Sequence, residues 1–97
     1  MILAVLSALA EPTTRLQAMR ILSDGEEHCI CELMAQIEAT QSRMPRHMQV
    51  LKQAGLVIDR RDTQWVRYRR NPNLSEELAT TVDAILAVPE AKERQAA

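Results

Sequence analysis

Aromatic residues are almost absent from this chain of 97 residues, which contains one Trp, one Tyr and no Phe. Its core must therefore be built from Leu, Ile, Val, Met and Ala, and it is modest because the chain is short. Small cores of this kind are often completed by a second subunit. The length fits a single domain, residues 1–97.

Cysteine and long apolar runs are also scarce. Two cysteines, two positions apart, exclude the disulfide framework of small secreted proteins and suggest metal or redox chemistry in a reducing compartment. The apolar run 2–9 lacks a basic leader and is too short for a signal peptide or a membrane span. We expect a cytoplasmic chain with no membrane partner.

Charge is distributed unevenly along the chain. The net charge is −1 overall, but it is +6 for residues 41–72, against −4 for residues 1–40 and −3 for residues 73–97. A basic segment in an otherwise acidic chain is the electrostatic pattern expected of a phosphate-binding surface.

The pattern of residues 40–57 predicts a helix within this basic segment. Met44, Met48, Leu51 and Ala54 recur at helical spacing, and Gly55 follows where a helix can end in the left-handed conformation. Gln and Arg side chains on the opposite face have bidentate partners on base edges in a DNA major groove. An ordinary surface helix with a solvated face is the alternative from this stretch alone.

The flanking segments predict the rest of the fold. A short helix precedes the basic one, and strands at 57–61 and 65–70 form an arginine-rich hairpin after it. Helices are expected at 2–10, from Pro12 to the Asp24–Gly25 stop, and at 74–88. The fold class is therefore mainly α with a small β-hairpin: a winged helix-turn-helix with five helices and a two-stranded wing.

Four stretches resemble the ArsR/SmtB family of metal-responsive repressors over nearly the whole chain. Residues 42–57 resemble its recognition-helix signature, and Cys29-Ile30-Cys31-Glu32-Leu33 is similar to the Cys-Val-Cys-Asp-Leu box of the arsenic-sensing branch. Residues 65–69 resemble the wing strand, and residues 9–13 resemble the start of the family domain. The resemblance implies a homodimer that represses a resistance operon and leaves its DNA operator when an inducer binds the cysteine box.

These expectations assign residues to three surfaces. The inducer site is Cys29 and Cys31, which hold arsenite or antimonite, and no catalytic cofactor is expected. The DNA-binding residues are Gln41, Ser42, Arg43, Arg46, His47, Lys52, Arg60, Arg61, Arg67 and Arg69. The dimer interface is formed by Ile2, Leu3, Val5, Leu6, Leu78, Val82, Ile85 and Leu86.

Three departures from the family pattern matter. Met34 stands where the arsenic box often has a third Cys, so three thiolates are not available within the box. Pro45 replaces a Ser of the recognition helix, which removes one candidate DNA contact and shifts the expected helix start to near Ser42. The last helix has no His, which argues against the zinc-type site of some relatives.

Thiolates select soft ions, and trivalent arsenic or antimony behaves similarly. Two thiols at positions i and i+2 lie on one side of an extended segment but on nearly opposite sides of a helix. Both can therefore bind one ion only if the chain is non-helical at Cys29. Two ordinary buried cysteines are the plain alternative, and His28 is a possible extra ligand or simply an exposed side chain.

Three other functions compete with a repressor released by metalloid. A thiol-redox or persulfide sensor would keep the DNA binding, although a Cys-x-Cys disulfide ring would be strained. An enzyme is not expected, because the sequence has no Ser-His-Asp set, phosphate loop or cofactor fingerprint. A winged helix that makes only protein contacts is the third alternative.

Overall fold

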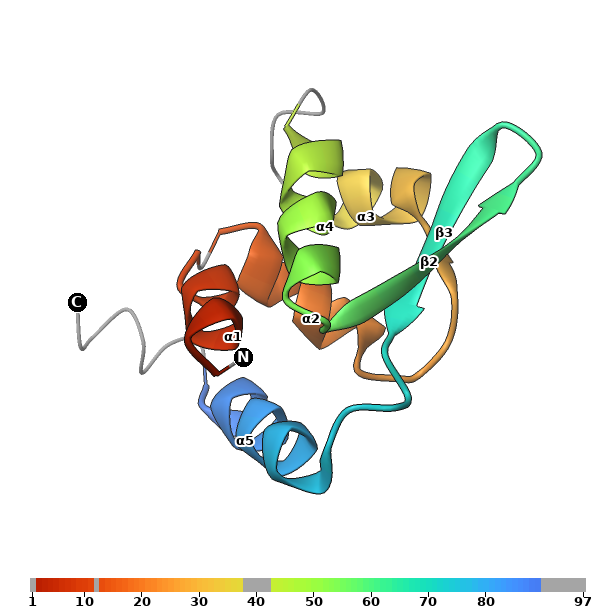
Figure 1. The fold of residues 1–97 in the computed structure, drawn as a ribbon. Coiled ribbons are helices and arrows are strands. Elements are labelled where there is room, and N and C mark those ends of the chain that lie inside the picture. Colours follow the sequence, from red (N-terminus) through yellow and green to blue (C-terminus); the bar gives the residue numbers. More distant parts are fainter. Residues whose placement is uncertain (1, 12, 38–42, 90–97) are drawn as a thin grey trace.

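A computed structural model of the chain describes residues 2–11, 13–37 and 43–89 (Figure 1). In these ranges the helices are α1 (Ile2–Leu9), α2 (Arg15–Leu22), α3 (Ile30–Gln36), α4 (Met44–Gln53) and α5 (Glu76–Ala87). The strands are β1 (His28–Cys29), β2 (Val57–Asp62) and β3 (Trp65–Arg70). This order confirms the predicted winged helix-turn-helix. None of the described helices has the length and apolar character needed to cross a membrane.

The sheet has one more strand than the sequence predicted. Its order is β1-β3-β2, and both pairs of strands are antiparallel. The hairpin β2–β3 turns at Thr63, which has a positive φ of 56°. The additional strand β1 places His28 opposite Tyr68 and Cys29 opposite Arg67. Two residues are too few for an alternating pattern, so β1 is defined only by its pairing with the free edge of β3.

An aliphatic core joins the helices to the base of the wing. Its largest fully buried side chains are Met19, Leu22, Leu33, Met44, Met48, Leu51, Leu56, Val5, Val57 and Val82. Tyr68 is buried beside them, whereas Trp65 is exposed near the tip of the wing. The predicted inward stripe of α4 is confirmed, because Ala54 is buried as well.

The ends of α4 are partly as predicted. Gly55 has a φ of 81°, and its N–H donates to the Lys52 carbonyl while the Leu56 N–H donates to the Leu51 carbonyl. At the other end α4 begins at Met44, with Pro45 in the first turn, where a proline costs no helical hydrogen bond. The helix thus starts slightly later than predicted, and Ser42, near which the start was expected, lies outside the described residues.

The second helix also starts later than the sequence suggested. α2 begins at Arg15, and Pro12 lies outside the described residues. The carboxylate of Glu11 accepts hydrogen bonds from the Thr14 N–H at 2.7 Å and the Arg15 N–H at 3.0 Å. A side chain that precedes the helix therefore satisfies donors of its first turn.

The predicted dimer interface needs a correction at two positions. Val5 and Val82 are both 0% exposed within the single chain, so they belong to its core and not to a free surface. The sequence could not distinguish the two cases, because both residues lie on apolar faces of terminal helices. Leu3 is 77% exposed and remains accessible, and α1 and α5 both lie at the end of the molecule away from the wing (Figure 1).

Candidate nucleic-acid interface and cysteine site

The two cysteines lie at the junction of strand β1 and helix α3. Cys29 has extended backbone angles, φ −64° and ψ 144°, and is the N-cap of α3, while Cys31 lies in the first turn. The Cys29 Sγ accepts a hydrogen bond from the Cys31 N–H at 3.3 Å, and Glu32 Oε1 accepts one from the Cys29 N–H at 3.4 Å. The sulfur thus takes the place of the hydroxyl in a capping box. The condition that the chain be non-helical at Cys29 is met.

The two thiols differ in environment. Cys29 is buried, and Cys31 is exposed. The hydrogen bond with Cys29, burial and the Cys29 charge together raise the pKa of Cys31. An ion that binds Cys31 must therefore displace its proton, which makes binding favourable at higher pH.

His28 is held by two carboxylates. Its Nε2 lies 2.8 Å from Asp24 Oδ2, and its Nδ1 lies 3.0 Å from Glu32 Oε2. Burial acts to lower the pKa of His28, but these two contacts outweigh it and raise that pKa. With both ring nitrogens engaged, His28 is not poised as a ligand. In the part of the chain that the structure describes, no three His, Cys, Asp or Glu side chains form a metal-binding group.

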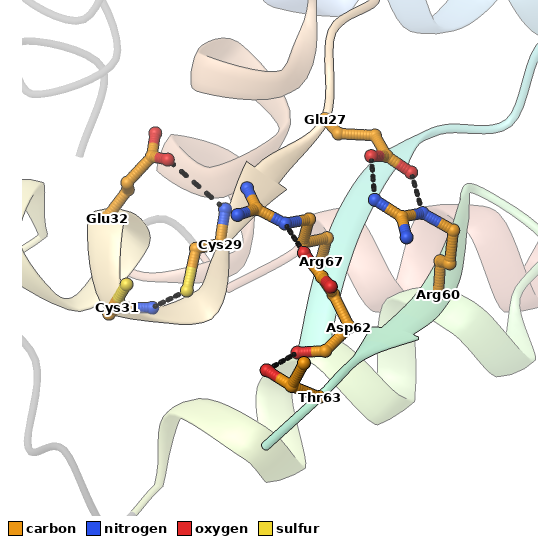
Figure 2. A network of polar contacts seen from close by, with 8 residues as sticks. All are labelled: Glu27, Cys29, Cys31, Glu32, Arg60, Asp62, Thr63 and Arg67. Carbon is orange, nitrogen blue, oxygen red and sulfur yellow. Dashed lines mark hydrogen bonds and ion pairs between the residues drawn. The ribbon is translucent and has the colours of Figure 1, made fainter. Parts of the chain in front are cut away.

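The cysteine site lies against the wing. Figure 2 shows Arg67 next to Cys29, its partner across the β1–β3 pair. The Arg67 Nε donates to Asp62 Oδ2 at 2.9 Å, and this contact raises the pKa of Arg67. Cys29 therefore lies beside a predicted DNA-binding residue.

Two of the four wing arginines predicted to contact DNA, Arg60 and Arg67, have acidic partners. Arg60 makes a bidentate contact with Glu27 at 2.8 and 2.9 Å, which lowers the pKa of that carboxyl (Figure 2). Lys52, near the end of α4, contacts Asp59 at 3.1 Å. Arg61 is exposed, whereas the Nε of Arg69 is buried and makes no hydrogen bond with the described residues.

The basic side chains at the start of α4 have a different environment. Arg43 and Arg46 are exposed, and neither has a hydrogen bond or ion pair within the described ranges. His47 is half-buried, and its Nδ1 accepts a hydrogen bond from Arg15 of α2 at 3.1 Å. The predicted residues Gln41 and Ser42 lie outside the described residues.

Sequence reasoning missed one residue of this surface, Arg15. Helical geometry places the centre of the exposed face of α4, opposite Met44, Met48 and Leu51, near Arg46 and Gln49. Helical spacing in the sequence already assigns Gln49 to the face left for solvent or a ligand, although Gln49 is not among the predicted DNA-binding residues. Arg15 had no comparable signal, because it is separated from α4 in the sequence and only packing brings α2 against α4.

Comparisons with known proteins agree with this architecture. The sequence profile described as "Bacterial regulatory protein, arsR family" matches residues 12–59. The chain is 34% identical over 70 residues to the arsenical resistance operon repressor of Escherichia coli strain K12, a match that covers 72% of this chain and 60% of that protein. It is 39% identical over 82 residues to the arsenic resistance transcriptional regulator ArsR1 of Pseudomonas putida KT2440, covering 84% and 60%. The chain thus spans about 60% of the length of these two relatives.

A solved structure supports the same assignment over almost the whole chain. The crystal structure titled "Possible transcriptional regulator for arsenical resistance" matches with a TM-score of 0.67 and 32% identity, covering 94% of this chain and 92% of that one. The relatives are transcriptional regulators and not enzymes. Together with the five helices, the wing and the cysteine box, these matches show that the chain belongs to the arsR family of bacterial regulatory proteins.

Proposed function

We propose that this protein is a homodimeric repressor of a metalloid-resistance operon. In this proposal it leaves its operator when arsenite or antimonite binds Cys29 and Cys31. The names of the two curated relatives support an arsenic-related signal. The observation that carries the proposal is the place of the cysteine box, which is both the edge strand of the wing sheet and the start of α3. An ion bound there acts on two elements that flank the DNA-binding surface.

The chemistry requires both sulfurs. Each thiol that reacts with arsenite loses its proton, an As–O bond is replaced by an As–S bond, and one water is released. Without inducer, the Cys29 Sγ accepts a hydrogen bond from the Cys31 N–H at 3.3 Å. Once this sulfur is bound to arsenic, it is a poorer acceptor for that N–H. Inducer binding therefore weakens the cap at the start of α3.

Two physical connections lead from this site to the DNA-binding surface. One runs through α3, which packs against α4. The other runs through the β1–β3 pairing, where Cys29 lies opposite Arg67. An arsenic atom bound to the Cys29 sulfur lies beside Arg67 and in this way acts on the position of the wing. Because the coupling is reciprocal, operator DNA must weaken inducer binding by the same factor.

Operator release during an arsenite titration, followed by fluorescence anisotropy, tests the proposal. Cys29→Ser and Cys31→Ser should each bind operator with affinity close to that of the wild type but fail to release it. A parallel titration with peroxide separates the redox alternative, because only a redox sensor should respond to it. If the double variant Cys29→Ser, Cys31→Ser releases operator like the wild type, the inducer assignment is wrong.

Met34→Cys provides a matched control for the site. Met34 is half-buried and packs against the core cluster, as expected of a core side chain and not of a ligand. A thiol at this position should leave the arsenite response unchanged. A stronger response would instead identify position 34 as a third ligand position.

The dimer is tested at residues that the single chain leaves accessible. Ile2, Leu3 and Leu6 of α1 are exposed, and Leu78, Ile85 and Leu86 of α5 are half-buried. Leu3→Asp should produce folded monomers that bind operator weakly, whereas Leu3→Ala should remain dimeric. Sedimentation velocity measures both variants, and a monomeric wild type would end this part of the proposal. Val82 is not suitable for this test, because its side chain is in the core and a charge there should unfold the chain.

A further inference from the structure

A basic pocket lies between the start of α2 and one flank of α4. Its volume is about 470 Å³, and its lining residues are Arg15, Arg43, Arg46, His47 and Val50. Three arginines and one histidine therefore line a common space, and no carboxylate is among the described residues that line it. Such a concentration of donors and positive charge suits a phosphate-type oxyanion.

The pocket is held in place by contacts of Arg15. The Arg15 Nε donates to the Ala8 carbonyl at 2.7 Å, and the Arg15 Nη1 donates to His47 Nδ1 at 3.1 Å. A guanidinium only donates, so His47 Nδ1 is the acceptor and its ring hydrogen lies on Nε2. Among the described residues, no acceptor engages the remaining Arg15 N–H groups or the His47 Nε2–H, so these can donate to a ligand. The geometry is thus formed before any ligand binds.

In the described part of the chain, no carboxylate forms an ion pair with an arginine of the pocket. The carboxylate of Glu11, at the start of α2, is engaged by the Thr13 hydroxyl and by the backbone N–H groups of Thr14 and Arg15. Burial acts to raise the pKa of Glu11, but these hydrogen bonds outweigh it and lower that pKa. Glu11 therefore orders the start of α2 as an ionised carboxylate and pairs with none of the arginines.

We propose that this pocket binds a phosphate of the DNA backbone, with Arg15 as a ligand contributed by α2. This inference rests on the DNA binding of the proposed function. The centre of the exposed face of α4 lies near Arg46 and Gln49. One flank of this face carries Lys52, which contacts Asp59 of β2, and the pocket lies on the opposite flank. A helix in the major groove has backbone phosphates on both of its flanks. The pocket receives the phosphate on the α2 side, and the wing lies at the other side.

The salt dependence of DNA binding tests this assignment. For Arg15→Gln, the slope of log K against log salt should decrease by about one, and affinity for operator and for unrelated DNA should fall by the same factor. Arg15→Lys keeps the charge, so it should keep the slope while binding more weakly, because one ammonium group cannot replace the guanidinium fork. Arg20→Gln is the matched control: it removes the same charge from the same helix, at a guanidinium that donates to the Val88 carbonyl, and should keep the wild-type slope.

A titration of the wild-type protein with inorganic phosphate removes any dependence on how the variants fold. At constant ionic strength, phosphate but not chloride should shift the NMR signals of the Arg15 Nε–H and the His47 ring. Phosphate binding together with an unchanged slope for Arg15→Gln would mean that the pocket takes a free oxyanion, and would overturn the assignment to DNA. If the wild type binds operator and Arg15→Gln has the same salt slope as the wild type, this inference alone is wrong. If the wild type binds no DNA, the proposed function is wrong as well.

Discussion

The start of α4 and the wing are both rich in arginine, but their arginines are in different states. At the start of α4, Arg43 and Arg46 have no acidic partner among the described residues. In the wing, Arg60 is paired with Glu27 and Arg67 with Asp62. A count of basic residues treats the two regions as equal, whereas the structure shows that only the first presents its full charge to a ligand.

The strand register explains why the wing needs its carboxylates. Arg60 lies directly opposite Arg67 in the β2–β3 pair, and like charges in that position destabilise a hairpin. Glu27 and Asp62 each bind one of the two guanidinium groups and offset the repulsion. DNA phosphate must compete with these carboxylates for the same donors, so Arg60 and Arg67 should contribute less to DNA affinity than the arginines at the start of α4.

The largest effect is therefore expected for an unpaired arginine of α4. Arg46→Ala should lower operator affinity by about 1–3 kcal/mol. Arg46 gives up no bond to a described carboxylate when it binds DNA, so the full contact is lost in the variant. Arg67→Ala is the matched change in the wing and should weaken binding by roughly fivefold or less. Anisotropy titrations at one salt concentration compare the two, and equal losses would break the distinction between the regions.

A smaller effect, on the free energy of unfolding and not on DNA affinity, is expected for Glu11 at the start of α2. Glu11→Ala should lower the free energy of unfolding by about 1 kcal/mol at pH 7, since donors at the start of α2 lose their acceptor. Because the folded-state pKa of Glu11 is lowered, its contribution is present above the pKa of the unfolded carboxyl and is lost as the pH falls through the folded value. Urea unfolding at pH 7 and pH 3 should show the gap between wild type and variant closing at low pH. A gap that is unchanged by pH would contradict this role.

The smallest effect is a gain of affinity in the wing. Glu27→Gln removes the charge that holds Arg60 and should tighten DNA binding by roughly two- to fivefold at low salt. The gain should disappear at high salt, where exposed charges are screened. Glu26→Gln is a matched control, because Glu26 is the exposed neighbouring acid and the structure shows no contact between it and an arginine. Equal gains from both variants would indicate a general charge effect and not the release of Arg60.

Local sequence patterns were sufficient for most of the fold. The spacing of Met44, Met48, Leu51 and Ala54 identified the buried stripe of α4, and Gly55 marked the end of that helix. Alternation on either side of Thr63 identified the hairpin. These features depend on contacts between residues close in sequence, and such contacts leave a periodic signature. The cysteine pair was likewise visible as a motif, together with the requirement that Cys29 be extended.

Only the tertiary structure decided which residues from distant segments meet. Strand β1 exists because β3 offers a free edge, and this pairing brings Cys29 to Arg67. Packing of α2 against α4 brings Arg15 to His47, and packing of the terminal helices encloses Val5 and Val82 in the core of one chain. Glu27, just before β1, pairs with Arg60 of the wing, and Asp62 of β2 pairs with Arg67 of β3. These contacts join residues far apart in the chain or on different elements, so they leave no periodic pattern and no local composition from which they could be predicted.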